Sequence, residues 1–160
     1  MTSAQTKTAP YGEGTVVINR VFDAPRELVW SCWTDAARMA QWFGPKGFTN
    51  PVCEIHARAG GAIRIVMRAP NGAEYPMKGV FREVVRPERL VFATAAIDEA
   101  GNHLLEGETT VTFAEQDGKT LLTLTTHAVG LVPIATQMLA GMEAGWTQSI
   151  DKLAALIAGG

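Results

Sequence analysis

VFDAPRELVWSCWTDAARMAQWFGP, residues 21–45, is the stretch that decides the fold, because it holds three of the four tryptophans of the chain. Asp23-Ala24-Pro25 predicts a turn from a strand into a helix, since proline suits a first helical position and an aspartate or the turn backbone can cap it. A helix over Arg26–Trp33 would be too rich in apolar residues to face solvent. It must therefore pack against a large apolar surface.

A second short helix follows in the same stretch. Thr34 or Asp35 is expected to cap its start. Gly44-Pro45 is expected to stop it after Trp42-Phe43, because neither residue continues a helix. Two short helices with this much aromatic surface predict a concave, apolar partner elsewhere in the chain.

Composition predicts one globular domain. Of the 160 residues, 47% are hydrophobic and 19% charged, and 14 basic residues stand against 16 acidic ones, which argues against a nucleic-acid-binding protein. No apolar run reaches the roughly eighteen residues of a membrane span, and residues 1–14 lack the apolar core of a signal peptide. We expect a flexible tail at 1–14, a single domain at 15–160, free thiols at Cys32 and Cys53, and a cytoplasmic location.

Beyond residue 45, turn residues separate segments rich in β-branched and aromatic residues, which is typical of an antiparallel meander. The sequence predicts strands at about 15–23, 51–58, 61–69, 74–86, 89–97, 104–115 and 119–127. The last segment, about Leu131–Ile157, has apolar residues at three- and four-residue steps and no break after Pro133. It is expected to form one long amphipathic helix.

The hairpin at Asp117-Gly118 predicts its own register, because this dipeptide favours a two-residue type I′ turn. Val111 then lies opposite Leu124 on a core face. Glu108 lies opposite His127 on the solvent face, where we expect an exposed ion pair.

At Asn71-Gly72 patterning favours a register shifted by one residue from a two-residue turn, with a longer loop or a bulge. The shift gathers apolar residues on one face, namely Ile63, Ile65, Met67, Tyr75, Met77 and Phe81. It gathers basic residues on the other, namely Arg64, Arg68, Lys78 and Arg82.

The order of elements predicts an α+β helix-grip fold. A curved antiparallel sheet of about 6–7 strands would carry two short helices after its first strand. One long C-terminal helix would cover its apolar face, leaving room for a cavity between sheet and helix.

Several pieces of the chain match a known family in their order. They are RVFDAP at 20–25, VW at 29–30, WFGP at 42–45, GG at 60–61, GVFREV at 79–84, PERLVF at 87–92 and GW at 145–146. The pattern resembles the START-like, or SRPBCC, superfamily, and within it the homologues of the activator of the heat-shock-protein-90 ATPase. The resemblance spans residues 15–157. It implies the START-like fold, also called birch-pollen-allergen-like, and a ligand-sized cavity. Because the superfamily includes lipid and hormone binders as well as cyclases, it leaves the activity open.

No motif of catalysis, metal binding or cofactor binding stands out. The histidines His56, His103 and His127 are scattered, and no nucleophile elbow, phosphate loop or dinucleotide fingerprint is present. We therefore expect no metal, no cofactor and no catalytic residue. His103 follows a loop at one end of the sheet and is expected to reach the cavity mouth. Glu83 is expected either to point inward at the sheet edge or to form a salt bridge.

The candidate ligand-binding residues are large apolar groups with a few polar tips, which suit a loose small-molecule pocket. They are Trp42, Met67, Tyr75, Met77, Phe81, Phe92, His103, Met138, Met142 and Trp146. The leading hypothesis is a protein that binds a small hydrophobic or aromatic molecule between sheet and helix. The alternatives are a cyclase- or hydratase-type enzyme using the same cavity and an interaction module related to the chaperone activator. A homodimer and a chaperone partner stay open.

Overall fold

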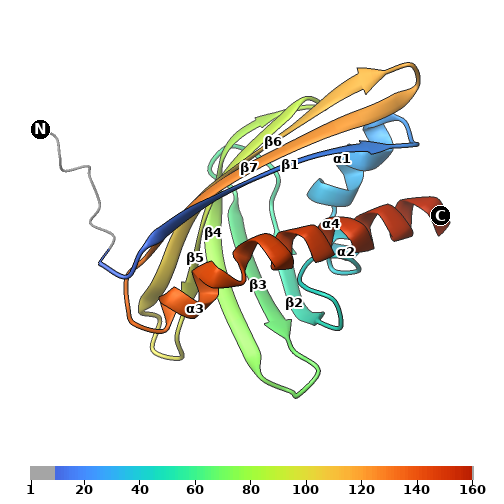
Figure 1. The fold of residues 1–160 in the computed structure, drawn as a ribbon. Coiled ribbons are helices and arrows are strands. Elements are labelled where there is room, and N and C mark those ends of the chain that lie inside the picture. The colour runs from blue at the N-terminus through green and yellow to red at the C-terminus, as the bar shows by residue number, and fades with distance from the viewer. Residues whose placement is uncertain (1–9, 160) are drawn as a thin grey trace, which may run out of the picture.

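The computed structural model describes residues 10–159 and shows one curved antiparallel sheet with helices across its concave face (Figure 1). The strand order is β1-β7-β6-β5-β4-β3-β2. The strands are β1 (Glu13–Phe22), β2 (Thr49–Ile55), β3 (Ala62–Arg68), β4 (Glu74–Val85), β5 (Arg89–Ile97), β6 (His103–Gln116) and β7 (Lys119–Gly130). This arrangement confirms the predicted helix-grip architecture.

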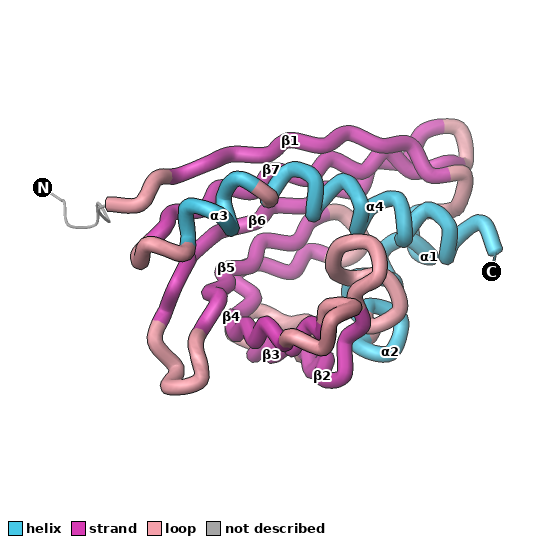
Figure 2. The backbone as a smooth tube through the Cα atoms, turned by 60° about the horizontal axis from the view of Figure 1, so that its bottom comes forward, coloured by secondary structure: helices cyan, strands magenta, loops and turns pink. Residues whose placement is uncertain are grey.

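Four helices complete the described part of the chain: α1 (Arg26–Thr34), α2 (Ala36–Met39), α3 (Ala135–Ala140) and α4 (Met142–Gly159). In Figure 2, α3 and α4 follow one another along the sheet, and α1 and α2 close the end near the C-terminal half of α4. No helix among residues 10–159 is long and apolar enough to cross a membrane.

The C-terminal cover is shorter and less regular than expected. It begins at Ala135, and at Gly141 the backbone leaves the ideal helix, with φ −93° and ψ −1°. The apolar periodicity of the sequence continues through Gly141 and therefore did not predict this break. The hydrogen bond from Gly141 N–H to Gln137 O is kept. Glycine has no side chain to resist the altered geometry.

At the other end, β1 begins inside the segment expected to be a tail. Tyr11 N donates to Gly130 O, and Gly130 N donates to Gly12 O. These bonds attach the start of the described chain to the end of β7. Residues 1–9 of the expected tail lie outside the described residues.

Both predicted hairpin registers are confirmed. Val111 pairs with Leu124 across β6 and β7, and Met67 pairs with Tyr75 across β3 and β4. At Asn71-Gly72 the loop is longer than two residues, with Ala69 N donating to Ala73 O. The hydrophobic pattern therefore decided the register where the turn dipeptide alone would have misplaced it.

The predicted ion pair between Glu108 and His127 is wrong, although the two residues are opposite each other. Glu108 pairs with Arg82 at 3.0 Å, and His127 Nε2 lies 3.0 Å from Glu13 Oε1. Thr15 Oγ1 is also 2.8 Å from His127 Nδ1. Long side chains reach diagonally across this solvent-exposed face, so direct opposition does not select the partner.

The aromatic stretch of the chain forms a packed cluster at the closed end. The Trp33 ring lies 4.6 Å from Trp42 and 6.3 Å from Trp146, and Trp30 lies 5.3 Å from Phe113 (centroid distances). All of these rings except that of Trp146 are buried. They fix α1 against the sheet and against α4. The neighbouring Cys32 thiol is free and buried, and burial raises its pKa.

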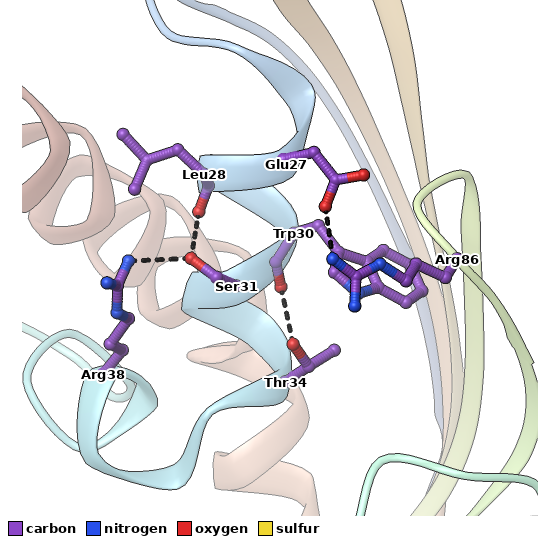
Figure 3. A network of polar contacts seen from close by, with 7 residues as sticks. All are labelled: Glu27, Leu28, Trp30, Ser31, Thr34, Arg38 and Arg86. Carbon is purple, nitrogen blue, oxygen red and sulfur yellow. Dashed lines mark hydrogen bonds and ion pairs between the residues drawn. The ribbon is translucent and has the colours of Figure 1, made fainter.

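The exposed side of α1 is held by polar contacts (Figure 3). Arg38 of α2 donates to Ser31 Oγ at 2.8 Å, and Arg86, which follows β4, pairs with Glu27 at 2.7 Å. Asp35 caps α2, since its Oδ1 accepts from Ala37 N and from the N–H of Arg38. The cap thus lies at the second of the two positions that the sequence allowed.

Replacing the cap residue should loosen the junction between the two short helices. We expect Asp35→Ala to lower the free energy of unfolding by about 1 kcal/mol, because two backbone N–H groups lose their acceptor. Asp35→Asn should keep most of that stability, since its amide oxygen can still accept. Urea denaturation measures both, and equal losses in the two variants would contradict the assigned cap.

Candidate functional site

A cavity of about 370 Å³ lies between the concave face of the sheet and the C-terminal helices. Three structural groups contribute its walls. From the sheet come Met67, Tyr75, Pro76, Met77, Thr94, Ala96, Leu105, Gly107, Thr109, Thr126 and Ala128. From the helices and the bend between them come Gln137, Met138, Gly141, Met142, Gly145, Trp146 and Ser149. From the loop after α2 come Phe43, Gly44, Pro45 and Phe48.

The space exists because one row of residues across the sheet is small. The pairings place Gly14, Ala128, Gly107, Thr94 and Gly79 side by side on five neighbouring strands. No member of the row reaches far toward the helices. A gap therefore stays open beneath α3 and the first turns of α4.

Gly79 is required by the sheet itself, and Gly107 leaves little room for a side chain. A Cβ on Gly79 would lie 2.2 Å from Ala93 O, and one on Gly107 would lie 3.2 Å from His127 O. No member of the row was among the predicted ligand-binding residues, which were chosen for their large side chains. Glycine inside a strand is a sign of close approach by backbone or ligand, and that sign was available at both positions.

The structure brings six of the ten predicted ligand-binding residues together on the cavity wall. They are Met67, Tyr75, Met77, Met138, Met142 and Trp146. Four are methionines, whose flexible thioethers adapt to irregular shapes. Tyr75 is 40% exposed and lies near Phe48, with ring centroids 6.0 Å apart, so these two rings flank the opening to solvent.

The other four predicted residues lie outside the lining. Trp42 is fully buried, and its Nε1 donates to Cys32 O at 2.9 Å, so it belongs to the aromatic cluster. Phe81 and Phe92 pack on each other in the core, with ring centroids 6.0 Å apart. They share the correct face of the sheet but occupy a different row from the small residues.

His103 is the fourth residue outside the lining. A β-bulge separates the pair His103–Ile97 from the pair Leu105–Ala96, which changes the alternation of faces at this end of β6. The imidazole Nδ1 is hydrogen-bonded to the carboxylate of Glu106. The ring is therefore engaged with a carboxylate rather than with the cavity.

Charge is absent from the described residues that line the cavity. Tyr75 is the one titratable side chain among them. Glu83, a candidate for an inward carboxylate, instead pairs with Arg89 at 2.8 Å, and both side chains are nearly half exposed. A bulge between Phe81 and Glu83 shifts the register there. Such walls suit a neutral, apolar molecule, because a buried charge would have no compensating partner.

The loop that forms the third wall is fastened to α4 by Lys152. Its Nζ donates to the carbonyl oxygens of Gly44, Pro45 and Phe48, each at 3.2 Å. Gln148 of the same helix accepts from Lys46 N at 3.0 Å. Burial lowers the pKa of Lys152 from its ordinary value, so the ammonium is partly desolvated where it holds the loop.

Comparisons with known proteins agree with this architecture. Residues 23–158 match the family of activator of Hsp90 ATPase homolog 1-like proteins. A crystal structure of a protein from Chromobacterium violaceum is 30% identical, with 89% of this chain and 96% of that chain covered and a TM-score of 0.76. The AHSA1 protein from Silicibacter pomeroyi is 26% identical, with 91% and 98% covered and a TM-score of 0.73. A Mycobacterium smegmatis protein is also 26% identical, with 89% of each chain covered and a TM-score of 0.72. No curated protein matches the chain.

Removing the ammonium of Lys152 should free the loop wall. We expect Lys152→Met to speed hydrogen exchange of the backbone amides at residues 44–48, because three carbonyl oxygens lose their donor. Global stability should fall by only about 1 kcal/mol, since the lost hydrogen bonds are partly offset by relief of the desolvation of the charge. Lys119→Met, at the exposed first residue of β7, is the control. Equal exchange at residues 44–48 in the two variants would show that Lys152 does not hold the loop.

Proposed function

The chain belongs to the family of activator of Hsp90 ATPase homolog 1-like proteins, and from this premise we propose that it binds a small, neutral, hydrophobic or aromatic molecule in the cavity between sheet and helices. The family match confirms the START-like resemblance that the sequence predicted. Membership does not identify a ligand, so the proposal rests on the site.

The cavity itself is the observation that carries the proposal. Protein interiors pack as densely as organic crystals, and voids much larger than a water molecule are uncommon in them. A space of about 370 Å³ falls within the usual range of small-molecule sites, about 300–1,000 Å³. The structure thus keeps open a volume that ordinary core residues could fill.

The walls favour binding by burial of apolar surface. Four methionines and Trp146 offer polarizable, adaptable contacts, and transfer of an apolar ligand from water would be favourable in proportion to the area buried. Tyr75 stands at the opening with its hydroxyl available to a polar group at the outer end of the ligand. A hydrogen bond from this hydroxyl would orient that end of the ligand.

The cyclase or hydratase alternative receives less support from the site. Acid–base chemistry needs a titratable group within hydrogen-bonding reach of the substrate. His103 and Glu83 were the candidates. His103 is hydrogen-bonded to Glu106, and Glu83 forms an ion pair with Arg89, both outside the cavity lining. Chaperone binding is a separate proposal suggested by the family name, and it would not require an open cavity. We further propose a cytoplasmic location, where the free thiols Cys32 and Cys53 would stay reduced.

Titration with N-phenyl-1-naphthylamine, a neutral fluorescent probe of apolar sites, tests the proposal. We expect saturable binding, with energy transfer from Trp146 because that ring lines the cavity. The variant Ala128→Leu places three further carbons in the row of small residues and should weaken binding at least about tenfold, because it occupies ligand volume. Its thermal midpoint should be maintained, since the added side chain fills a void.

Ala114→Leu is the matched control, because Ala114 is an exposed alanine on β6 outside the cavity lining. It should bind the probe as the unmodified protein does. Absence of saturable binding to the unmodified protein would contradict the proposed function. Equal weakening by both substitutions would place the probe elsewhere on the molecule.

A further inference from the structure

Two threonines form a polar spot within the apolar cavity. Thr109 on β6 and Thr126 on β7 are directly opposite each other, and their Oγ1 atoms are 2.8 Å apart. They are 3% and 4% exposed, and both line the cavity. A deeply buried pair of hydroxyl groups is therefore present in the sheet wall, with the apolar residues Phe92 and Val16 as its cross-strand neighbours.

The hydrogen bond between the two threonines leaves one hydroxyl proton without an acceptor. Each hydroxyl has one proton, and a single bond between the two oxygens uses only one of them. Within residues 10–159 neither oxygen has a further hydrogen bond. Other buried hydroxyls differ: Thr120 donates to Ala24 O, and Ser149 donates to Gly145 O. The second proton of the threonine pair can rotate toward the cavity, because no protein acceptor holds it.

A spare buried donor has a cost unless something accepts from it. We propose that Thr109 and Thr126 select a ligand with a neutral acceptor oxygen, a carbonyl above all, at its buried end. This inference rests on the proposed function and specifies the class of ligand: a ketone, aldehyde, ester or quinone on a hydrophobic frame. The carbonyl oxygen would accept the free hydroxyl proton while the hydrophobic frame contacts the methionines.

Charge decides between neutral and ionised acceptors. A carboxylate would be the stronger acceptor, but the described lining contains no arginine, lysine or histidine to compensate its charge. Lys152 of α4 lies outside the lining, and its ammonium donates to the three loop carbonyls. A buried anion would lose its hydration without an ion partner, so the neutral oxygen is favoured.

The experiment compares matched molecules that differ by one carbonyl group. The pairs are benzophenone with diphenylmethane, indan-1-one with indane, and 2-undecanone with undecane. Each competes with N-phenyl-1-naphthylamine, and the ratio of the two dissociation constants in a pair is the readout. Comparing this ratio between protein variants cancels the difference in hydrophobicity between the two molecules.

The double variant Thr109→Val with Thr126→Val removes both hydroxyls while keeping side-chain shape. We expect the preference for the carbonyl member to fall roughly fivefold or more, the factor that one hydrogen bond contributes. Either single variant should retain the preference, because the remaining hydroxyl still has a proton to donate. The double variant Thr110→Val with Thr125→Val, at the next cross-strand pair of β6 and β7 and outside the cavity lining, is the control and should retain it too. Thermal midpoints establish that each variant is folded.

The outcomes separate this inference from the proposed function. The role of the threonine pair would be overturned if the ratio of dissociation constants were unchanged in the double variant. It would also be overturned if no carbonyl compound displaced the probe. Either result would leave probe binding intact. If the double variant unfolds, the two single variants combined with an ether series, dibenzyl ether against 1,3-diphenylpropane, decide the matter. The unmodified protein and both single variants should then bind the ether more tightly than the hydrocarbon. Equal affinity for the two compounds would overturn the inference. Failure of the probe itself to bind would refute the proposed function, and this inference with it.

Discussion

The position of Trp146 is the constraint on which the interior depends. One side of its ring stacks on Trp33 at 6.3 Å, with an interplanar angle of 15°, and Phe43 meets it edge-on at 5.9 Å. The same residue lines the cavity. Large rings therefore hold α4 away from the sheet at the closed end. The glycine and alanine residues beyond this point cannot fill the resulting gap. The cavity therefore results from large rings at the closed end and small residues beyond them.

Most of the fold could be predicted because period-2 patterning and turn chemistry act locally. Alternation placed Met67 and Tyr75 on one face before the pairing was known, and the Asp117-Gly118 turn predicted the pairing of β6 with β7. The break at Gly141 was not predicted, because local patterning does not show whether a helix bends. A glycine inside an apolar periodic segment is tolerated by a helix, and only packing shows whether the helix bends there.

The site was predicted less completely, and the reason is geometric. Alternation tells which face a residue lies on but not which row along the strand it occupies. Phe81 and Phe92 share the cavity face and lie in the packed core, one row away from the small residues. His103 shows a further limit, because a bulge at the end of β6 cannot be located from alternation. By alternation Thr109 and Thr126 share the core face with Val111 and Leu124, but their spare donor became visible only once the pairing and the hydrogen bonds were known.

Methionine-methyl NMR with bound N-phenyl-1-naphthylamine tests the central claim most directly, because the wall of the cavity contains Met67, Met77, Met138 and Met142. Met39 lies in the core outside the lining and is an internal reference. We expect intermolecular nuclear Overhauser effects from the probe to the four wall methyls and none to Met39. Contacts to Met39 with none to the wall methyls, or no contact with any of them at saturation, would contradict it.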